Sequence, residues 1–103
     1  MKVYLDDERT APDGWVLVNK VEDVIYLYDC ITDLSLDHDL GENNKTGYDF
    51  LCWLEEKLFC FPGTISKLPN ITIHSQNPVG RQNMQRVLQS VNYLYLKGGA
   101  SEI

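Results

Sequence analysis

Short apolar segments alternate along the chain with segments whose apolar residues recur at helical spacing. Strands that alternate with helices are typical of a mostly parallel sheet covered on both faces. The sequence therefore predicts an α/β fold with a mostly parallel sheet of about five strands, flanked by about three helices. The segments expected to contain the strands are KVYLDD, WVLV, DLSLD, NITIHS and YLYL.

The first two expected strands are joined in an unusual way. Only the loop ERTAPDG, residues 8–14, separates them, and it contains the turn residues Pro12, Asp13 and Gly14. A connection without a helix predicts either an antiparallel pair or an unusual crossover between two parallel strands.

Capping signals mark the starts of the expected helices. Asn19 is expected to cap a helix over about residues 20–29. Thr46 with Asp49 forms a capping-box pattern at the start of a second helix. A third helix is expected to begin at Pro78, a residue that suits the first helical position because it has no N–H there to leave unpaired.

Size and charge limit the partners of the protein. The 103 residues, 44% of them hydrophobic, predict a single domain over 1–103 with a loose tail at about 98–103. A net charge of −6 argues against duplex DNA as a partner, because duplex binding relies on Lys and Arg. No apolar run reaches the roughly 20 residues that span a bilayer. The acidic residues that follow MKVYL do not fit the apolar core of a signal peptide. We expect a cytoplasmic protein without a membrane partner, and the oligomeric state is open.

The three cysteines carry no metal or disulfide signal. Their number is odd, they are not spaced as a pair, and no histidine lies beside them at zinc-ligand spacing. We expect Cys30, Cys52 and Cys60 to be reduced and to lie buried or half-buried.

Polar residues follow the expected strands. In open parallel sheets ligands bind beyond the carboxyl ends of the strands, so residues distant in sequence should converge there. The candidates are Asp6, Asp7, Glu8 and Arg9; Asp37, His38 and Asp39; His74, Ser75, Asn77 and Arg81; and Lys97.

The acids and histidines of this edge predict two kinds of chemistry. Carboxylates are ligands that Mg²⁺ favours, although acids after strands also start turns and cap helices. The acids are Asp6, Asp7, Asp37 and Asp39. His38 and His74 are the only histidines, and an imidazole pair can act as base and acid when a phosphodiester opens. Asp37 or Asp39 would orient one imidazole, and His74 could instead be half-buried against a backbone carbonyl.

The segment HSQNPVGRQNM, residues 74–84, is typical of an anion site. A helix N-terminus favours anions, and Ser75 adds a hydroxyl. Arg81 can donate to two phosphate oxygens. Arg9 is a second candidate for holding the phosphate, or it pairs with Glu8 or Asp7. Asn77 is first of all a helix cap.

Four segments together resemble the cyclic-phosphate-processing receiver-like domains, small proteins of bacteria and bacteriophages related to response-regulator receivers. The segments are YLDDERTAPDGW at 4–15, SLDHDLG at 35–41, TGYDFLCWLEE at 46–56 and IHSQNPVGRQNM at 73–84. The resemblance implies a receiver-like, flavodoxin-like fold. The sequence departs from receivers in having only the loop ERTAPDG, and no helix, between the first two expected strands. It also implies action on cyclic phosphates, such as nucleotide 2′,3′-cyclic ends or related ADP-ribose products.

The resemblance also implies roles for single residues. Asp6, Asp7 and Asp37 match the acidic metal-binding pocket of receivers. Ser75 matches the receiver hydroxyl position, and Lys97 matches the receiver lysine. The two histidines and the two arginines of the edge are not receiver features.

The leading hypothesis is a phosphoesterase, a cyclic phosphodiesterase that hydrolyses a cyclic phosphate of a nucleotide, RNA end or ADP-ribose derivative. The partner would be a small phosphorylated nucleotide or an RNA terminus. The cofactor would be Mg²⁺, or there would be none. One alternative is a binder that sequesters a cyclic nucleotide without cleaving it, and another is a signalling module phosphorylated on Asp37. The assigned roles are catalysis by His38, His74 and Asp37; phosphate binding by Arg9, Ser75, Asn77, Arg81 and Lys97; and metal binding by Asp6, Asp7, Asp37 and Asp39.

Overall fold

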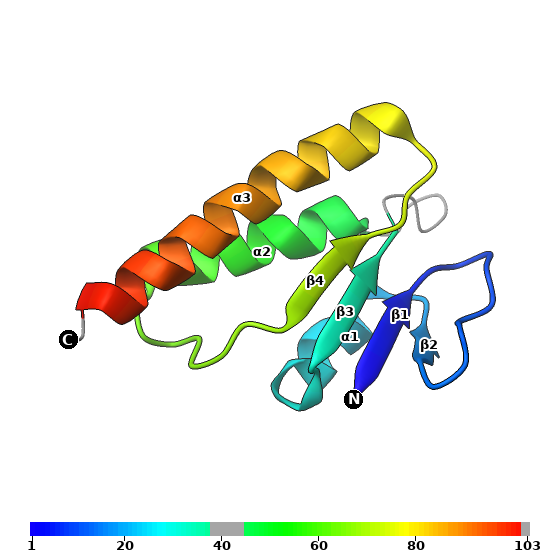
Figure 1. Ribbon diagram of the computed structural model, residues 1–103, viewed down its shortest axis with the longest axis horizontal. Helices are drawn as coiled ribbons and strands as arrows, with labels where there is room; N and C mark the ends of the chain where they lie inside the picture. The colour runs from blue at the N-terminus through cyan, green and yellow to red at the C-terminus, as the bar shows by residue number, and fades with distance from the viewer. Residues whose placement is uncertain (38–44, 102–103) are drawn as a thin grey trace.

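A four-stranded parallel sheet in the order β2-β1-β3-β4 forms the centre of the molecule (Figure 1). The computed structural model describes residues 1–37 and 45–101, so His38 and Asp39 lie outside the described residues. These elements form one α/β domain with a receiver-like fold. The strands are β1 (Lys2–Leu5), β2 (Val16–Val18), β3 (Asp33–Leu36) and β4 (Asn70–Ile73), and the helices are α1 (Val21–Leu27), the short 3₁₀ helix η1 (Tyr28–Cys30), α2 (Gly47–Cys60) and α3 (Pro78–Ser101).

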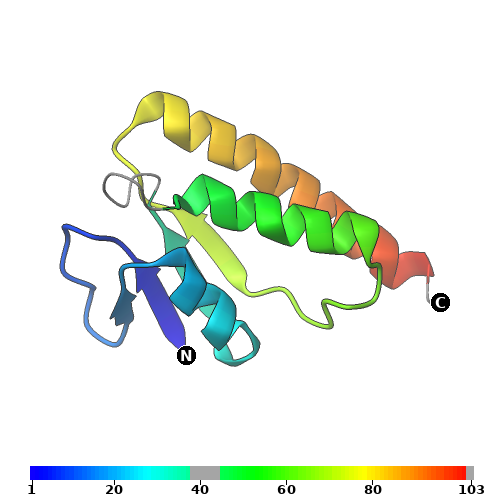
Figure 2. The same cartoon turned by 180° about the vertical axis from the view of Figure 1, so that it is seen from behind.

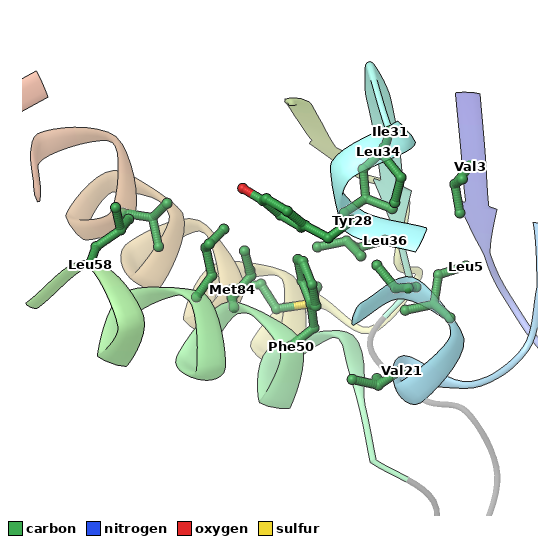
Figure 3. Packing of buried hydrophobic residues seen from close by; sticks show 14 residues of the cluster. Val3, Leu5, Val21, Tyr28, Ile31, Leu34, Leu36, Phe50, Leu58 and Met84 are labelled. Atoms are coloured by element: carbon green, nitrogen blue, oxygen red, sulfur yellow. The ribbon is translucent and has the colours of Figure 1, made fainter. Parts of the chain in front are cut away.

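The core lies between the sheet and α2. Leu5 of β1 and Leu36 of β3 are fully buried, since alternate strand residues point to the same face. Phe50 of α2 and Met84 of α3 pack against this face (Figure 3). Burying one such side chain contributes about 1.5–3 kcal/mol to folding, so this face anchors the strand ends.

Among the described residues, no helix covers the second face of the sheet (Figure 1). Helices α1 and α2 lie on one face (Figure 2), and α3 packs mainly against α2 alongside β4. On the opposite face Leu17 is 46% exposed, and Thr72 is exposed as well. The prediction of a sheet covered on both faces is therefore wrong. A loop replaces the helix between β1 and β2, and no described helix takes its place.

The predicted fifth strand is wrong. Residues 93–96, YLYL, lie inside α3, which continues through Ser101 where a loose tail was expected. The physical reason is that Val91, Leu94 and Tyr95 extend the helical spacing of the preceding apolar residues, with no Gly or Pro in between. Val91 is fully buried, so the helical face continues past residue 90.

The first two strands pair parallel, so of the two predicted arrangements the crossover is the observed one. The register joins Val3 to Val16 and Leu5 to Val18. The connecting loop turns where Trp15 N–H donates to the Pro12 carbonyl at 3.1 Å. Gly14 has φ +85°, a conformation that a side chain disfavours, so the turn requires glycine there.

Two of the three predicted caps are confirmed. The Thr46 side chain accepts a hydrogen bond from Asp49 N–H, and the Asp49 carboxylate accepts one from Thr46 N–H. The Asn77 side chain accepts from Gly80 N–H at 3.1 Å. The prediction of Asn19 as the first cap is wrong, because α1 begins one residue later, with Lys20 at the N-cap and no side-chain cap bond.

The cysteine prediction holds only in part. Cys52 is half-buried on α2, whereas Cys30 and Cys60 are exposed at the ends of η1 and α2. All three are free thiols. Within the part of the chain that the structure describes, no helix combines the length and apolarity needed to cross a bilayer.

Candidate functional site

Three strand ends bring Asp6, Asp37 and His74 together. Asp37 N–H donates to the Leu5 carbonyl at 3.0 Å, and His74 N–H donates to the Leu36 carbonyl at 2.9 Å. These bonds extend the strand pairing by one residue beyond β3 and β4. One ligand atom of each of the three side chains lies within 4.8 Å of the others. We call these residues the Asp–Asp–His cluster.

Asp6 is buried and organises the loop after β1. It is 1% exposed, and its Oδ1 accepts hydrogen bonds from Glu8 N–H at 2.8 Å and Arg9 N–H at 2.9 Å. Its Oδ2 lies 2.9 Å from His74 Nε2. Burial by itself raises the pKa of Asp6, but the two backbone N–H donors and His74 outweigh it and lower the pKa below 3.8. Asp6 is therefore ionised at neutral pH.

The lowered pKa of Asp6 predicts acid sensitivity. The pKa of Asp6 is lower in the folded than in the unfolded protein, so between these two pKa values the unfolded state binds more protons. Stability is therefore lost as the pH falls through the folded pKa, which lies below 3.8. We expect Asp6→Asn to be less stable than wild type at neutral pH and to lose less stability in acid. Urea unfolding at a series of acidic pH values measures this, with the exposed Asp13→Asn as control. An Asp6→Asn protein with the wild-type pH dependence would contradict it.

Both ring nitrogens of His74 are engaged inside the protein. Nε2 faces Asp6, and Nδ1 lies 2.7 Å from the Ser35 hydroxyl. The ring also stacks on Tyr4, with centroids 4.1 Å apart and an interplanar angle of 8°. An imidazole held on both nitrogens and one face has a fixed position. It cannot exchange protons with a substrate while both hydrogen bonds are in place.

The partners of His74 assign its proton. An ionised Asp6 only accepts hydrogen bonds, so Nε2–H donates to it, and in the neutral ring Nδ1 accepts from the Ser35 hydroxyl. A serine hydroxyl can also accept. Ser35 therefore satisfies Nδ1 in either tautomer. Without its proton, Nε2 would face the Asp6 carboxylate as a second acceptor, so a cation would have to take the place of that proton.

Sequence reasoning missed Tyr4 and Ser35. Both lie in the middle of strands and point to the face opposite the core, in register with each other. Their sequence pattern could have indicated them. In each strand a polar or aromatic residue stands between two buried apolar neighbours, as in Val3-Tyr4-Leu5, and therefore points to the opposite face. The sequence does not show that His74 reaches across that face.

Arg9 ties the loop after β1 to the end of β4. It is half-buried, and its Nη1 donates to the His74 carbonyl at 3.2 Å. A guanidinium carries five N–H donors, so this bond positions Arg9 beside the cluster and uses one of them. The structure places the predicted phosphate-binding arginine next to Asp6 and His74. Its contact with a phosphate remains a prediction.

The loop after β4 is arranged by its own side chains. Ser75 is 4% exposed, and its hydroxyl accepts a hydrogen bond from Asn77 N–H at 3.1 Å. The Asn77 side chain uses the N–H of Gly80, one of the donors at the start of α3. Arg81 lies exposed in the first turn of that helix. Ser75 and Asn77 therefore shape the loop, and Arg81 is an exposed cation of this segment.

Two predicted site residues lie away from the cluster. Lys97 is exposed near the end of α3, 5.9 Å from the Tyr93 ring centroid. At about 1.5 Å per helical residue it lies roughly 24 Å along the helix from Arg81. Its place at the sheet edge depended on the predicted fifth strand, which does not form. Asp7 is exposed and does not belong to the Asp–Asp–His cluster, and His38 and Asp39 lie outside the described residues.

Gly47 is a further residue that sequence reasoning missed. It is buried at the first position of α2, where the helix approaches the backbone of Asp37. A Cβ at this position would collide with the Asp37 carbonyl oxygen and would lie 2.8 Å from Met84 Cε. The absence of a side chain at Gly47 thus allows α2 to pack directly against the end of β3.

Comparison with known proteins agrees with this geometry. No curated protein and no solved structure matches the chain. The profile of the cyclic-phosphate processing receiver domain matches residues 1–90, which include the four strands and the three residues of the Asp–Asp–His cluster. The chain therefore belongs to the cyclic-phosphate processing receiver domain family.

Proposed function

We propose that the protein hydrolyses a cyclic phosphate of a nucleotide, RNA end or ADP-ribose derivative at the Asp–Asp–His cluster. The observation that carries the proposal is the convergence of two carboxylates and an imidazole within 4.8 Å at the carboxyl ends of the strands. Asp6 is buried and ionised there, with its charge held by two backbone N–H groups and His74. Membership in a family that processes cyclic phosphates supports the same conclusion.

The donor set fits a divalent cation. Asp6 Oδ2 and His74 Nε2 are 2.9 Å apart, and neighbouring ligands of one ion at about 2.1 Å and a right angle lie about 3 Å apart. Asp37 would supply the third ligand. Two carboxylates with one imidazole suit Mn²⁺ or another first-row ion, whereas Mg²⁺ prefers oxygen ligands alone. When bound, the cation would polarise a phosphoryl oxygen and offset its negative charge.

The chain's own residues would handle the protons of the reaction. A bond forms between a water oxygen and phosphorus, and the bond from phosphorus to one ring ester oxygen breaks. Asp37 would take the proton from the attacking water through a carboxylate oxygen. His38, which follows it in the sequence, would give a proton to the leaving oxygen. The remaining N–H groups of Arg9 would hold the phosphate oxygens.

This assignment changes the role proposed for His74. With both nitrogens engaged by Ser35 and Asp6, it is suited to hold a cation at Nε2 rather than to act as the second acid or base. Binding would move the ring proton to Nδ1, which then donates to Ser35. His38 keeps the acid role.

A panel of cyclic phosphates tests the proposal. Purified protein is incubated with nucleoside 2′,3′-cyclic phosphates and with ADP-ribose derivatives that carry a cyclic phosphate. The incubations contain Mn²⁺, Mg²⁺ or a chelator, and phosphorus NMR follows ring opening. We expect turnover that the chelator abolishes and that Asp6→Asn lowers by about 100-fold or more. The exposed Asp13→Asn, in the same loop, is the matched control.

Other outcomes would support the alternatives. Tight binding of a cyclic phosphate that is recovered unaltered after denaturation would indicate a binder instead of a hydrolase. A base-labile adduct formed from a small phosphodonor and lost in Asp37→Asn would indicate a phosphorylated signalling module. Intact substrates without either result would contradict the proposed activity.

A further inference from the structure

The uncovered face of the sheet adjoins the candidate site. Parallel register places Leu17, Tyr4, Ser35 and Thr72 in one row across β2, β1, β3 and β4 on this face. No described helix covers the row. Leu17 and Thr72 at its ends are exposed, Tyr4 is half-buried, and Ser35, which is bonded to His74, is buried. Figure 1 shows the sheet from this side, with α1 behind it. A ligand at the strand ends can therefore extend onto the sheet itself.

Three rings form a continuous aromatic row on this face. Tyr4 stacks on His74, and the Trp15 ring meets the Tyr4 ring edge-on, with centroids 6.3 Å apart at 81°. Tyr4 and Trp15 are half-buried, and neither belongs to the hydrophobic core cluster. Large rings that do not build the core and remain partly in water are typical of binding surfaces.

The row begins at the site and ends at a cation. His74 is both its first ring and a member of the Asp–Asp–His cluster. At the other end, Lys2 Nζ lies 5.8 Å from the Trp15 ring centroid. The chain as a whole has a net charge of −6, but Lys2 places a positive charge beside this ring. That charge would attract an electron-rich or anionic ligand. The row thus connects the Asp–Asp–His cluster, where the phosphate would lie, with the Trp15 ring.

We propose that the substrate carries an aromatic base that stacks on Trp15 while its cyclic phosphate lies at the cluster, which makes it a nucleoside cyclic phosphate. This inference rests on the proposed function and narrows its substrate class. Trp15 is the stacking residue, because a fixed His74 ring covers one face of Tyr4, whereas the group over the Trp15 ring is the flexible, exposed side chain of Lys2. Every nucleobase offers a π-face, so stacking selects for the presence of a base and not for its identity.

Paired substrates test the role of Trp15. Adenosine 2′,3′-cyclic phosphate carries a base, whereas glycerol cyclic phosphate does not. We expect Trp15→Ala to lower kcat/KM for the adenosine substrate by about 5- to 100-fold, mainly through KM. The value for the glycerol substrate should be unchanged, and Trp15→Phe should retain most of the wild-type activity. Equal losses with both substrates, or no loss with either, would overturn the proposal.

Fluorescence separates this inference from the proposed activity. A Trp53→Phe background leaves Trp15 as the one tryptophan, and adenosine monophosphate is titrated into it, with glycerol phosphate as control. Quenching by adenosine monophosphate alone supports the stacking surface even if no cyclic phosphate is hydrolysed. Hydrolysis of both substrates without quenching overturns the surface and leaves the activity standing. Quenching that follows protein concentration instead of nucleotide would assign the face to a second copy of the chain and overturn the proposal.

Discussion

An Asp37→Asn variant is expected to lose hydrolysis of cyclic phosphates, with kcat/KM lower by about 100-fold or more. Asp37 stands at the carboxyl end of β3 with its carboxylate in the Asp–Asp–His cluster. Asparagine keeps the shape of the side chain but removes its charge and one acceptor oxygen. It therefore removes both the base and one ligand of the cation while leaving the fold in place.

The other end of the same strand supplies the control. Asp33 is also half-buried on β3, but it lies at the amino end, where Asn70 donates to its carboxylate at 3.5 Å. Asp33→Asn should keep wild-type activity and metal affinity. Calorimetric titration with Mn²⁺ gives the second readout, and Asp37→Asn should bind the ion at least about 10-fold more weakly. Wild-type activity in Asp37→Asn would remove Asp37 from the mechanism.

A Gly47→Ala variant is expected to be destabilised by about 1–3 kcal/mol, since one added methyl group in a closed contact forces the neighbours apart. The collision is with the carbonyl oxygen of Asp37 and with Met84. Because Asp37 is displaced along with the helix, weaker Mn²⁺ binding should accompany the loss of stability. Urea unfolding and calorimetry measure the two effects.

Thr46→Ala distinguishes this effect from simple weakening of α2. It removes the cap one residue earlier and should cost about 1 kcal/mol without a collision at Asp37. We expect Thr46→Ala to lower stability and to keep metal affinity near the wild-type value. If both variants reduced metal affinity in proportion to stability, Gly47 would have no special role at the site.

Most of the fold could be predicted because local signals and long-range packing agree. Alternation of strands with helices predicted the parallel sheet, and the Thr46 and Asn77 caps began helices where expected. The failure at residues 93–96 has a physical cause. In isolation, YLYL is compatible with a strand. Its apolar residues also continue the helical spacing of α3, and the packing of α3 against α2 stabilises the helix.

The site was predictable at the level of backbone position and less so at the level of contacts. Residues that follow strands meet at one edge by topology, which brought Asp6, Asp37 and His74 together as expected. Side-chain direction is set by tertiary packing, so the double engagement of His74 by Ser35 and Asp6 could not be derived from spacing. The same holds for the contact between Gly47 and the end of β3.

The bond between Asp6 and His74 joins residues 68 positions apart in the chain. Closing such a long loop costs chain entropy before any contact is gained, and β4 joins the sheet only through β3. A chain in which β1 and β3 have paired but β4 has not docked therefore contains the two carboxylates without the imidazole. The cluster is complete only in the fully folded protein, so a ligand that needs all three groups stabilises the native state cooperatively and distinguishes it from partly folded chains.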